Sequence, residues 1–176
     1  MPARACPWPT RTSGSRRWTG THAVTLAFLP MLARSRGAIV NILSVNSLAA
    51  LPLLPAYSVS KAAAFSLTQS LRALLAGQGV SVHAVLAGPV YTDMLRGSGI
   101  PKASPESVAR AIFDAVEKGE EDIFPDPASQ FVAESWRAGA AKALEHQLAM
   151  LVQAPSVTAY AREPAAASGP ARARDG

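Results

Sequence analysis

The chain has 176 residues, 49% of them hydrophobic, and a formal net charge of +5 at pH 7. This length supports one substantial core, so we expect one folded domain. The positive excess lies outside residues 37–150, where ten acidic residues outnumber eight basic ones. Because that stretch has no basic face of the kind a nucleic-acid-binding domain carries, we expect no nucleic-acid partner.

The cysteine count and the apolar runs limit the cellular compartments in which the protein is expected. Cys6 is the single cysteine, which excludes an internal disulfide and favours a reducing compartment. Arg34 and Arg36 interrupt the longest apolar candidate, so we expect no membrane span. The N-terminus lacks the apolar stretch of a secretory signal, which predicts a cytoplasmic location. The three histidines have no metal-ligand spacing, so no metal site is predicted.

The first part of the chain predicts a lead-in followed by a helix. Residues 1–18 are rich in Pro and Arg without periodicity, which indicates an irregular lead-in. From 19 to 34 apolar residues recur at helical spacing before a basic last turn. Pro30 lies inside this helix, and we expect a kink there because the apolar stripe continues beyond it.

The middle of the chain predicts two buried strands around a long helix. Residues 38–43 form a short β-branched run that is typical of an inner parallel strand, and residues 80–86 form a second. Between them, a loop over 44–55 precedes a helix over 56–76, which Gly77 and Gly79 end.

The last part predicts two further helices and a short strand. Ser104 as N-cap and Pro105 at the first helical position begin a helix that runs to Lys118. Residues 122–124 predict a strand, 128–150 one helix, and 151–176 a disordered tail. We expect Glu120, Glu121 and Asp122 to form a solvated turn.

This alternation predicts an α/β fold with a parallel sheet and right-handed crossovers. Residues 19–150 would form its single domain. Ligands of such folds bind beyond the carboxyl ends of the strands. Ser44 follows the first strand, while Tyr57 and Lys61 begin the next helix, four residues apart and therefore on one face.

These residue types suit proton transfer at a carbonyl or alcohol. Tyr57 can exchange a proton with the substrate oxygen, the Lys61 ammonium favours the phenolate that a base requires, and Ser44 can orient the same oxygen. The alternative for Tyr57 and Lys61 is a half-buried tyrosine beside a solvated lysine.

The turn after the second strand, A-G-P-V-Y-T, would complete the site. Gly88, which has no Cβ, would allow a flat ligand ring to approach, and Thr92 can donate to a carboxamide. Met94 and Trp136 could line a substrate pocket, but packing explains them equally well.

The ordered set G-A-I-V-N-I-L-S, Y-S-V-S-K-A-A and V-H-A-V-L-A-G-P-V-Y-T-D-M resembles the second half of a classical short-chain dehydrogenase/reductase. The resemblance implies a partial Rossmann-like, doubly wound fold and NAD or NADP as cofactor. It implies a secondary alcohol or ketone as substrate. Ser44, Tyr57 and Lys61 would be catalytic, and the cofactor would be bound by Tyr57, Lys61, Gly88, Pro89, Val90 and Thr92.

The family's first half has no counterpart here. The glycine-rich turn T-G-x-x-x-G-x-G and the N-N-A-G segment do not occur, and Arg17 stands where the family has a helical asparagine. We hypothesise an N-terminally truncated or frameshifted member and predict weak or no binding of NAD(P)H. The predicted strand 38–43 would then expose an apolar edge.

The resemblance also implies a homo-oligomer through the helices 19–34 and 56–76, which form the family's dimer interface. The alternative function is therefore an inactive fragment or dimerisation module without cofactor binding. The substrate and the choice between NAD and NADP remain open, since the loop after Asp93 is the variable part of such enzymes.

Overall fold

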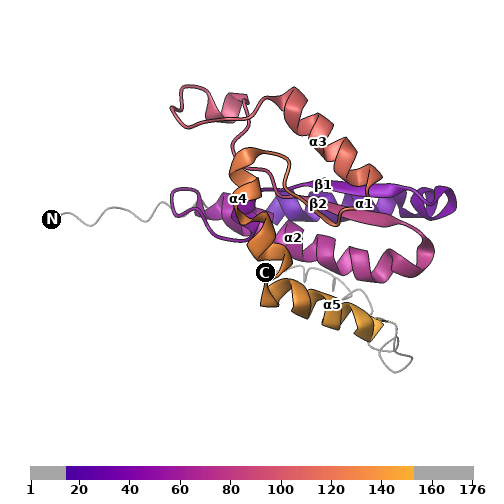
Figure 1. Ribbon diagram of the computed structural model, residues 1–176. Helices are drawn as coiled ribbons and strands as arrows, with labels where there is room; N and C mark the ends of the chain where they lie inside the picture. Colours follow the sequence, from indigo (N-terminus) through magenta and orange to yellow (C-terminus); the bar gives the residue numbers. More distant parts are fainter. Residues whose placement is uncertain (1–14, 153–176) are drawn as a thin grey trace, which may run out of the picture.

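The computed structural model describes residues 15–152, with side chains from Gly20 onward. Helices and strands alternate along this part of the chain from α1 to α4, and a fifth α-helix follows α4 directly (Figure 1). Their bounds are α1 Ser15–Ser35, β1 Ala38–Ile42, α2 Pro55–Leu75, β2 Ser81–Val85, α3 Pro105–Glu117, β3 Asp122–Ile123, α4 Pro127–Arg137 and α5 Ala140–Val152. Of the predicted irregular lead-in, residues 1–14 lie outside the described residues, and residues 15–18 are wrongly predicted because they form the start of α1. The predicted tail lies outside the described residues from position 153 onward.

The three strands form one parallel sheet in the order β1-β2-β3. Ala38 pairs with Ser81 and Ile42 with Val85, so β1 and β2 end together. β2 lies between the other two strands and is buried, as the sequence predicted. β1 lies at the edge of the described sheet and only Ile39 in it is buried, so the expectation of an inner strand there is wrong. The α/β class and the parallel sheet are confirmed.

Helices cover the two faces of the sheet unequally. α1 and α2 cover the face to which Ile39, Leu43 and Val82 point, whereas α3 packs on the opposite face over Val85 (Figure 1). The chain steps in one direction from β1 to β2 to β3, but its two connections lie on opposite faces. They therefore have opposite hands, and the expectation of uniformly right-handed crossovers is wrong.

Local signals place most helix ends where the sequence predicts them. Pro55 occupies the first turn of α2, and Gly79, with φ of 71°, lies in the left-handed region just after it. The Ser104 hydroxyl accepts from the N–H of Ser107 and caps α3. Pro30 lies inside α1 without ending it.

The helix predicted over 128–150 is instead two helices, α4 and α5. The chain changes direction between the two helices at Gly139. A Cβ added there would lie 2.8 Å from the carbonyl oxygen of Ser135 and 3.2 Å from that of Trp136. Only a glycine lets the chain pass this close to the end of α4. α5 then continues to Val152, two residues past the predicted end.

Candidate active site

Ser44 lies where β1 ends, buried with 6% of its surface exposed. Its hydroxyl accepts from the N–H of Asn46 at 3.2 Å. On either side, the N–H of Leu43 donates to Val85 at 2.8 Å and that of Val45 to Ala87 at 3.0 Å. The end of β2 therefore fixes the backbone of Ser44 beside the turn that contains Gly88.

Tyr57 lies in the first turn of α2 and is half-buried. The adjacent Ser58 hydroxyl accepts from the N–H of Leu51 at 3.0 Å and donates to the carbonyl of Leu54 at 3.2 Å. These bonds tie the loop after Ser44 to the start of α2. The position of Tyr57 relative to β1 is thus set by a hydrogen-bonded loop.

Lys61 joins the start of α2 to the end of β1. Its Nζ donates to the carbonyl of Ile42 at 2.8 Å and lies 5.7 Å from the centroid of the Tyr57 ring. Ile42 is the last residue of β1, two positions before Ser44. The ammonium therefore lies between the tyrosine ring and the strand end that presents the serine.

Gly88 is required by packing against α4. Its N–H donates to Oδ2 of Asp126 at 2.7 Å, and an added Cβ would lie 2.5 Å from Oδ1 of the same carboxylate. Asp126 is the N-cap of α4, in a capping box with Ser129. Asp126 fills the space of the missing Cβ, which explains the need for glycine by packing, and the approach of a ligand ring to this turn stays a prediction.

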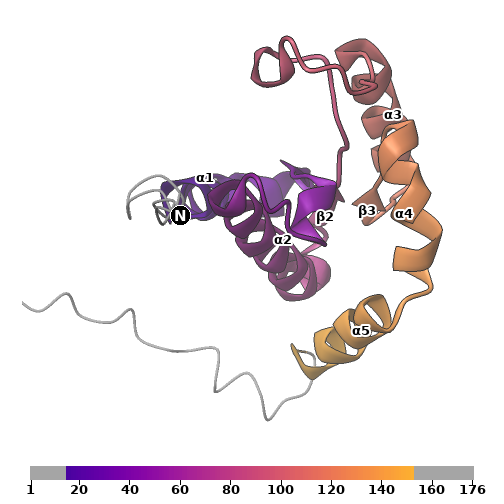
Figure 2. The ribbon, with the colours of Figure 1, turned by 90° about the vertical axis from the view of Figure 1, so that its left-hand side faces the viewer.

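Pro89, Val90 and Thr92 lead from the sheet into a loop. The Pro89 carbonyl accepts from the N–H of Ala103 at 3.0 Å, and the N–H of Tyr91 donates to the Ala103 carbonyl at 3.0 Å. This pairing holds Val90 extended and closes the intervening loop at its base. The loop stands away from the body (Figure 2), and Thr92 is exposed with no side-chain capping bond.

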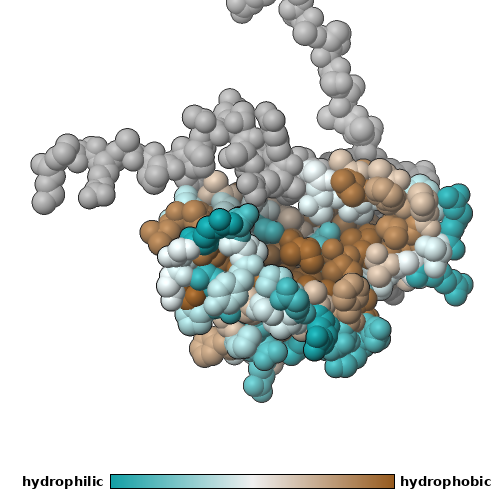
Figure 3. All heavy atoms as spheres, turned by 90° about the horizontal axis from the view of Figure 1, so that it is seen from above, coloured by the Kyte–Doolittle hydropathy of each residue, from teal (hydrophilic) through white to brown (hydrophobic). Residues whose placement is uncertain are grey.

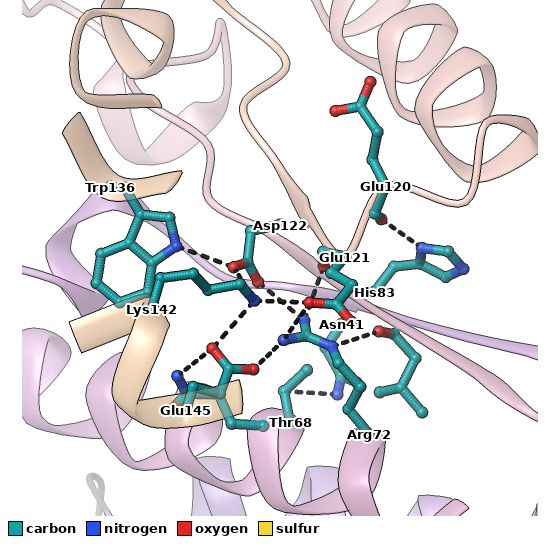
Figure 4. Close-up of polar contacts among 12 residues, drawn as sticks. Asn41, Thr68, Arg72, His83, Glu120, Glu121, Asp122, Trp136, Lys142 and Glu145 are labelled. Carbon is teal, nitrogen blue, oxygen red and sulfur yellow. Dashed lines mark hydrogen bonds and ion pairs between the residues drawn. The ribbon is translucent and has the colours of Figure 1, made fainter. Parts of the chain in front are cut away.

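A buried ion-pair cluster at the other end of α2 is the feature that sequence reasoning missed (Figure 4). Arg72 lies 2.8 Å from Asp122 and also pairs with Glu145. Lys142 lies 2.8 Å from Asp122, 2.7 Å from Glu121 and 3.1 Å from Glu145. The cluster joins α2, β3 and α5, so the expectation of a solvated turn at Asp122 is wrong.

Opposing effects set the pKa values in this cluster. Burial alone would raise the pKa of Asp122, but the Arg72 charge and the hydrogen bonds from Lys142 and Trp136 lower it. Burial alone would lower the pKa of Lys142, but Asp122 and Glu121 raise it. Both groups are held in their charged forms, which suits ion pairs that attach α5 to α2 and β3.

Other features of the described chain add no catalytic group. A groove of about 740 Å³ runs between α2 and α5, and none of the three predicted catalytic residues lines it. Trp136 packs on Phe65, with ring centroids 5.6 Å apart, while Met94 is exposed. In residues 15–152 no three His, Cys, Asp or Glu side chains are arranged to hold a metal. None of the described helices is long and apolar enough to cross a membrane.

The sequence signature of a protein family covers this same region. Residues 15–101, which include α1, β1, α2, β2 and all the predicted site residues, match the family described as short chain dehydrogenase. The chain belongs to this family. The family of the sequence-based resemblance and its Rossmann-like fold are thereby confirmed.

Relatives of this short-chain dehydrogenase include enzymes and one protein named as inactive. It is 44% identical over 96 residues to the "Inactive 2-(S)-hydroxypropyl-CoM dehydrogenase 2" of Xanthobacter autotrophicus, covering 53% of this chain and 42% of that protein. A short chain dehydrogenase from Burkholderia cenocepacia, solved in complex with NADP, superposes with a TM-score of 0.69 at 34% identity. That match covers 81% of this chain and 62% of the other.

A second similar structure is the bulky-bulky ketone specific alcohol dehydrogenase from Comamonas testosteroni. Its TM-score is 0.60 at 25% identity, with 83% of this chain and 56% of that chain covered. The short-chain dehydrogenase described here therefore spans about two fifths to three fifths of the length of these relatives.

Proposed function

We propose that this short-chain dehydrogenase carries the proton-transfer site of an NAD(P)-dependent oxidoreductase that interconverts a secondary alcohol and a ketone. The observation that carries the proposal is the position of Lys61. Its ammonium contacts the face of Tyr57 and the last carbonyl of the strand that ends beside Ser44. Tyr57 and Lys61 thus lie beside the carboxyl end of β1, which Ser44 follows, and ligands of parallel sheets bind at that edge.

The roles follow from the chemistry of each group. Tyr57 donates its proton to the carbonyl oxygen of a ketone, or accepts the proton of an alcohol in the reverse direction. The hydroxyl of Ser44 donates a hydrogen bond to the same oxygen and orients it. Lys61 places its ammonium 5.7 Å from the centroid of the Tyr57 ring, beside the group proposed to exchange the proton.

The residues after β2 fit the nicotinamide end of NAD(P). Val90 lies in a fixed extended segment, and the exposed hydroxyl of Thr92 is available to a carboxamide. The cofactor would supply the hydride acceptor or donor. A glycine-rich turn for its phosphates does not occur in the sequence, so Lys61, Val90 and Thr92 would hold only one end.

A turnover assay tests the proposal. With NADPH in large excess and a panel of secondary ketones, we expect slow reduction that Tyr57→Phe lowers by about 10²- to 10⁴-fold, the usual contribution of a general acid. Ser66→Ala, on the exposed face of the same helix, should leave the rate unchanged. Equal rates for Tyr57→Phe and the wild type would contradict the assigned role.

A second candidate is a module that associates with a copy of itself without catalysis. The inactive status in the name of the Xanthobacter relative favours it, as do exposed apolar side chains on α1 and α2. We infer a homo-oligomer through residues 19–34 and 56–76, with Met31, Val59 and Leu74 at its surface. Absence of turnover together with a stable dimer by light scattering would favour this candidate.

The extent of the folded domain and the cellular location are further proposals. We propose that residues 19–150 act as one folded unit and that the protein resides in the cytoplasm, as its single cysteine favours. Fractionation of cells that express a tagged chain would test the location.

A further inference from the structure

α5 is attached to the rest of the fold by polar side chains and not by apolar packing. Lys142 is its one buried residue, and none of its side chains belongs to the apolar clusters that form the core of the described chain. Leu144, Leu148 and Leu151 are between 50% and 53% exposed. Because a helix of a folded domain normally turns its apolar side chains to the core, this face of α5 is open to a further apolar group.

A groove of about 740 Å³ lies between α5 and α2. Leu144, Leu148 and Val152 line it from α5, and Ala73 and Ala76 line it from α2. The short side chains of the two alanines leave room between the helices. The volume is of the size that a small-molecule ligand occupies, and such sites are mostly apolar with a few polar groups.

The ion-pair cluster distinguishes this groove from other apolar surface, such as the band that crosses the α3 side of the molecule (Figure 3). Arg72, Glu121 and Glu145 of the cluster line the groove. Three carboxylates of the cluster face two cations, namely Glu121, Asp122 and Glu145 against Arg72 and Lys142. One negative charge is therefore in excess at the wall of the groove.

The donors of the cluster are already engaged. Each side-chain nitrogen of Arg72 contacts an oxygen, and the ammonium of Lys142 contacts three carboxylates. The remaining capacity belongs to acceptors. Within the described chain, the contacts of the Glu121 carboxylate are to Oε2 alone, and Gln69 uses its amide nitrogen but not its amide oxygen. The cluster can therefore accept a hydrogen bond from a ligand but has none to donate to an anion.

Glu121 presents this excess charge to the groove. Its side chain is 44% exposed, against 2% for Asp122 and 9% for Glu145. Burial alone would raise the pKa of Glu121, but the hydrogen bond from Lys142 and the charge of Arg72 lower it. The carboxylate is therefore ionised at neutral pH and accessible to a ligand.

We propose that the groove between α2 and α5 binds an aliphatic chain that ends in a primary ammonium group. The chain lies along Leu144, Leu148 and Val152, and the ammonium donates to the Glu121 carboxylate. An ammonium has three donors and no acceptor, which matches a wall whose free polar atoms are acceptors. A carboxylate or phosphate end would meet a like charge and would find no free donor in the cluster.

Three decyl compounds of equal length test the site by titration calorimetry of the full chain, below their micelle concentrations. Decylamine is a cation at neutral pH, 1-decanol is neutral and decanoate is an anion. We expect decylamine to bind one-to-one and about tenfold more tightly than 1-decanol, the usual gain from a hydrogen bond to a charged group. Decanoate should bind more weakly than either. The fluorescence of Trp136, which lines the groove, should change on binding.

Two substitutions separate the charge from the apolar wall. Glu121→Gln should reduce the preference for decylamine over 1-decanol to less than about twofold, whereas Glu117→Gln, at an exposed carboxylate that ends α3, should leave it unchanged. Leu148→Gln should weaken both ligands at least about fivefold. Met150→Gln, at a side chain of α5 that is 64% exposed and outside the groove lining, should bind like the wild type.

Circular dichroism of each variant checks folding. If Glu121→Gln fails to fold, the comparison of the three compounds on the wild type and on Leu148→Gln decides.

The outcomes are independent of catalysis, because none of the three predicted catalytic residues lines the groove. Preferential binding of decylamine that Glu121→Gln removes and Leu148→Gln weakens supports the site. No binding, equal affinity for the three compounds, tighter binding of decanoate, or affinity insensitive to both substitutions would overturn it. A dimer of the chain that excludes decylamine, detected by light scattering, would also overturn it, since the groove would then be a contact between copies.

Discussion

Position 88 requires a glycine because the Asp126 carboxylate occupies the space that a side chain would fill. The N-cap carboxylate of α4 lies against its Cα, and the same carboxylate accepts from its N–H. One residue thereby joins the turn after β2, where the cofactor is proposed to bind, to the start of α4. Family resemblance pointed to this glycine, but its packing partner lies 38 residues away and has no sequence signal.

Replacing this glycine tests that packing. Gly88→Ala should lower the free energy of unfolding by about 1–3 kcal/mol, because the new methyl group displaces the Asp126 carboxylate and weakens the cap of α4. Gly99→Ala is the matched control, since an added Cβ there meets nothing within 4 Å, and should change stability by less than about 0.5 kcal/mol. Urea denaturation measures both, and equal midpoints would refute the packing requirement.

The element scale shows which parts of the fold a sequence can predict. Helix ends at Ser104 and Gly79 were predictable, because capping and left-handed backbone depend on residues within one turn. The break at Gly139 was not, since the pattern on both sides is helical and the cause is the nearby carbonyl of Ser135. The site residue Lys61 was predictable in type and spacing, but its bond to Ile42 depends on how α2 docks on β1.

The break between α4 and α5 gives the second stability prediction. Gly139→Ala should lower the free energy of unfolding by about 1–3 kcal/mol, because its Cβ would clash with the carbonyl oxygen of Ser135. Gly20→Ala, inside α1 with nothing within 4 Å, should raise it by about 0.5–1 kcal/mol through helix propensity. Thermal or urea unfolding distinguishes the opposite signs, and a stabilising Gly139→Ala would mean that α4 and α5 can join into one helix.

At the scale of the whole molecule, one ion-pair cluster fastens the C-terminal helices to the sheet. Arg72 of α2 is 50 residues from Asp122 and 73 from Glu145 along the chain. No local pattern marks these residues as partners, which is why the sequence predicted a solvated turn. Removing one member of a buried cluster leaves its partners charged and unpaired, which costs more than the pair contributes.

The pKa shifts determine how the contribution of this cluster to stability depends on pH. Asp122 has a lowered pKa, so its contribution to stability is present above its ordinary pKa of about 4 and is lost as the pH falls below that value. Lys142 has a raised pKa, so its contribution is present below its ordinary pKa of about 10.4 and is lost as the pH rises above it. Between these limits the cluster should stabilise the fold at a constant level.

Urea denaturation of the wild type and of Lys142→Met from pH 3 to 11 tests this dependence. Lys142→Met should lose about 3–5 kcal/mol at neutral pH, because Asp122 and Glu145 lose a buried partner. Its stability should also fall less above about pH 10.4 than that of the wild type, since the titrating ammonium is gone. Lys118→Met, at an exposed position after α3, should follow the wild type throughout. If the alkaline loss were the same with and without Lys142, its ammonium could not be what holds α5 in place, and the packing of α5 against α2, with the hydrogen bond from Gln69 to Glu145, would have to carry that attachment.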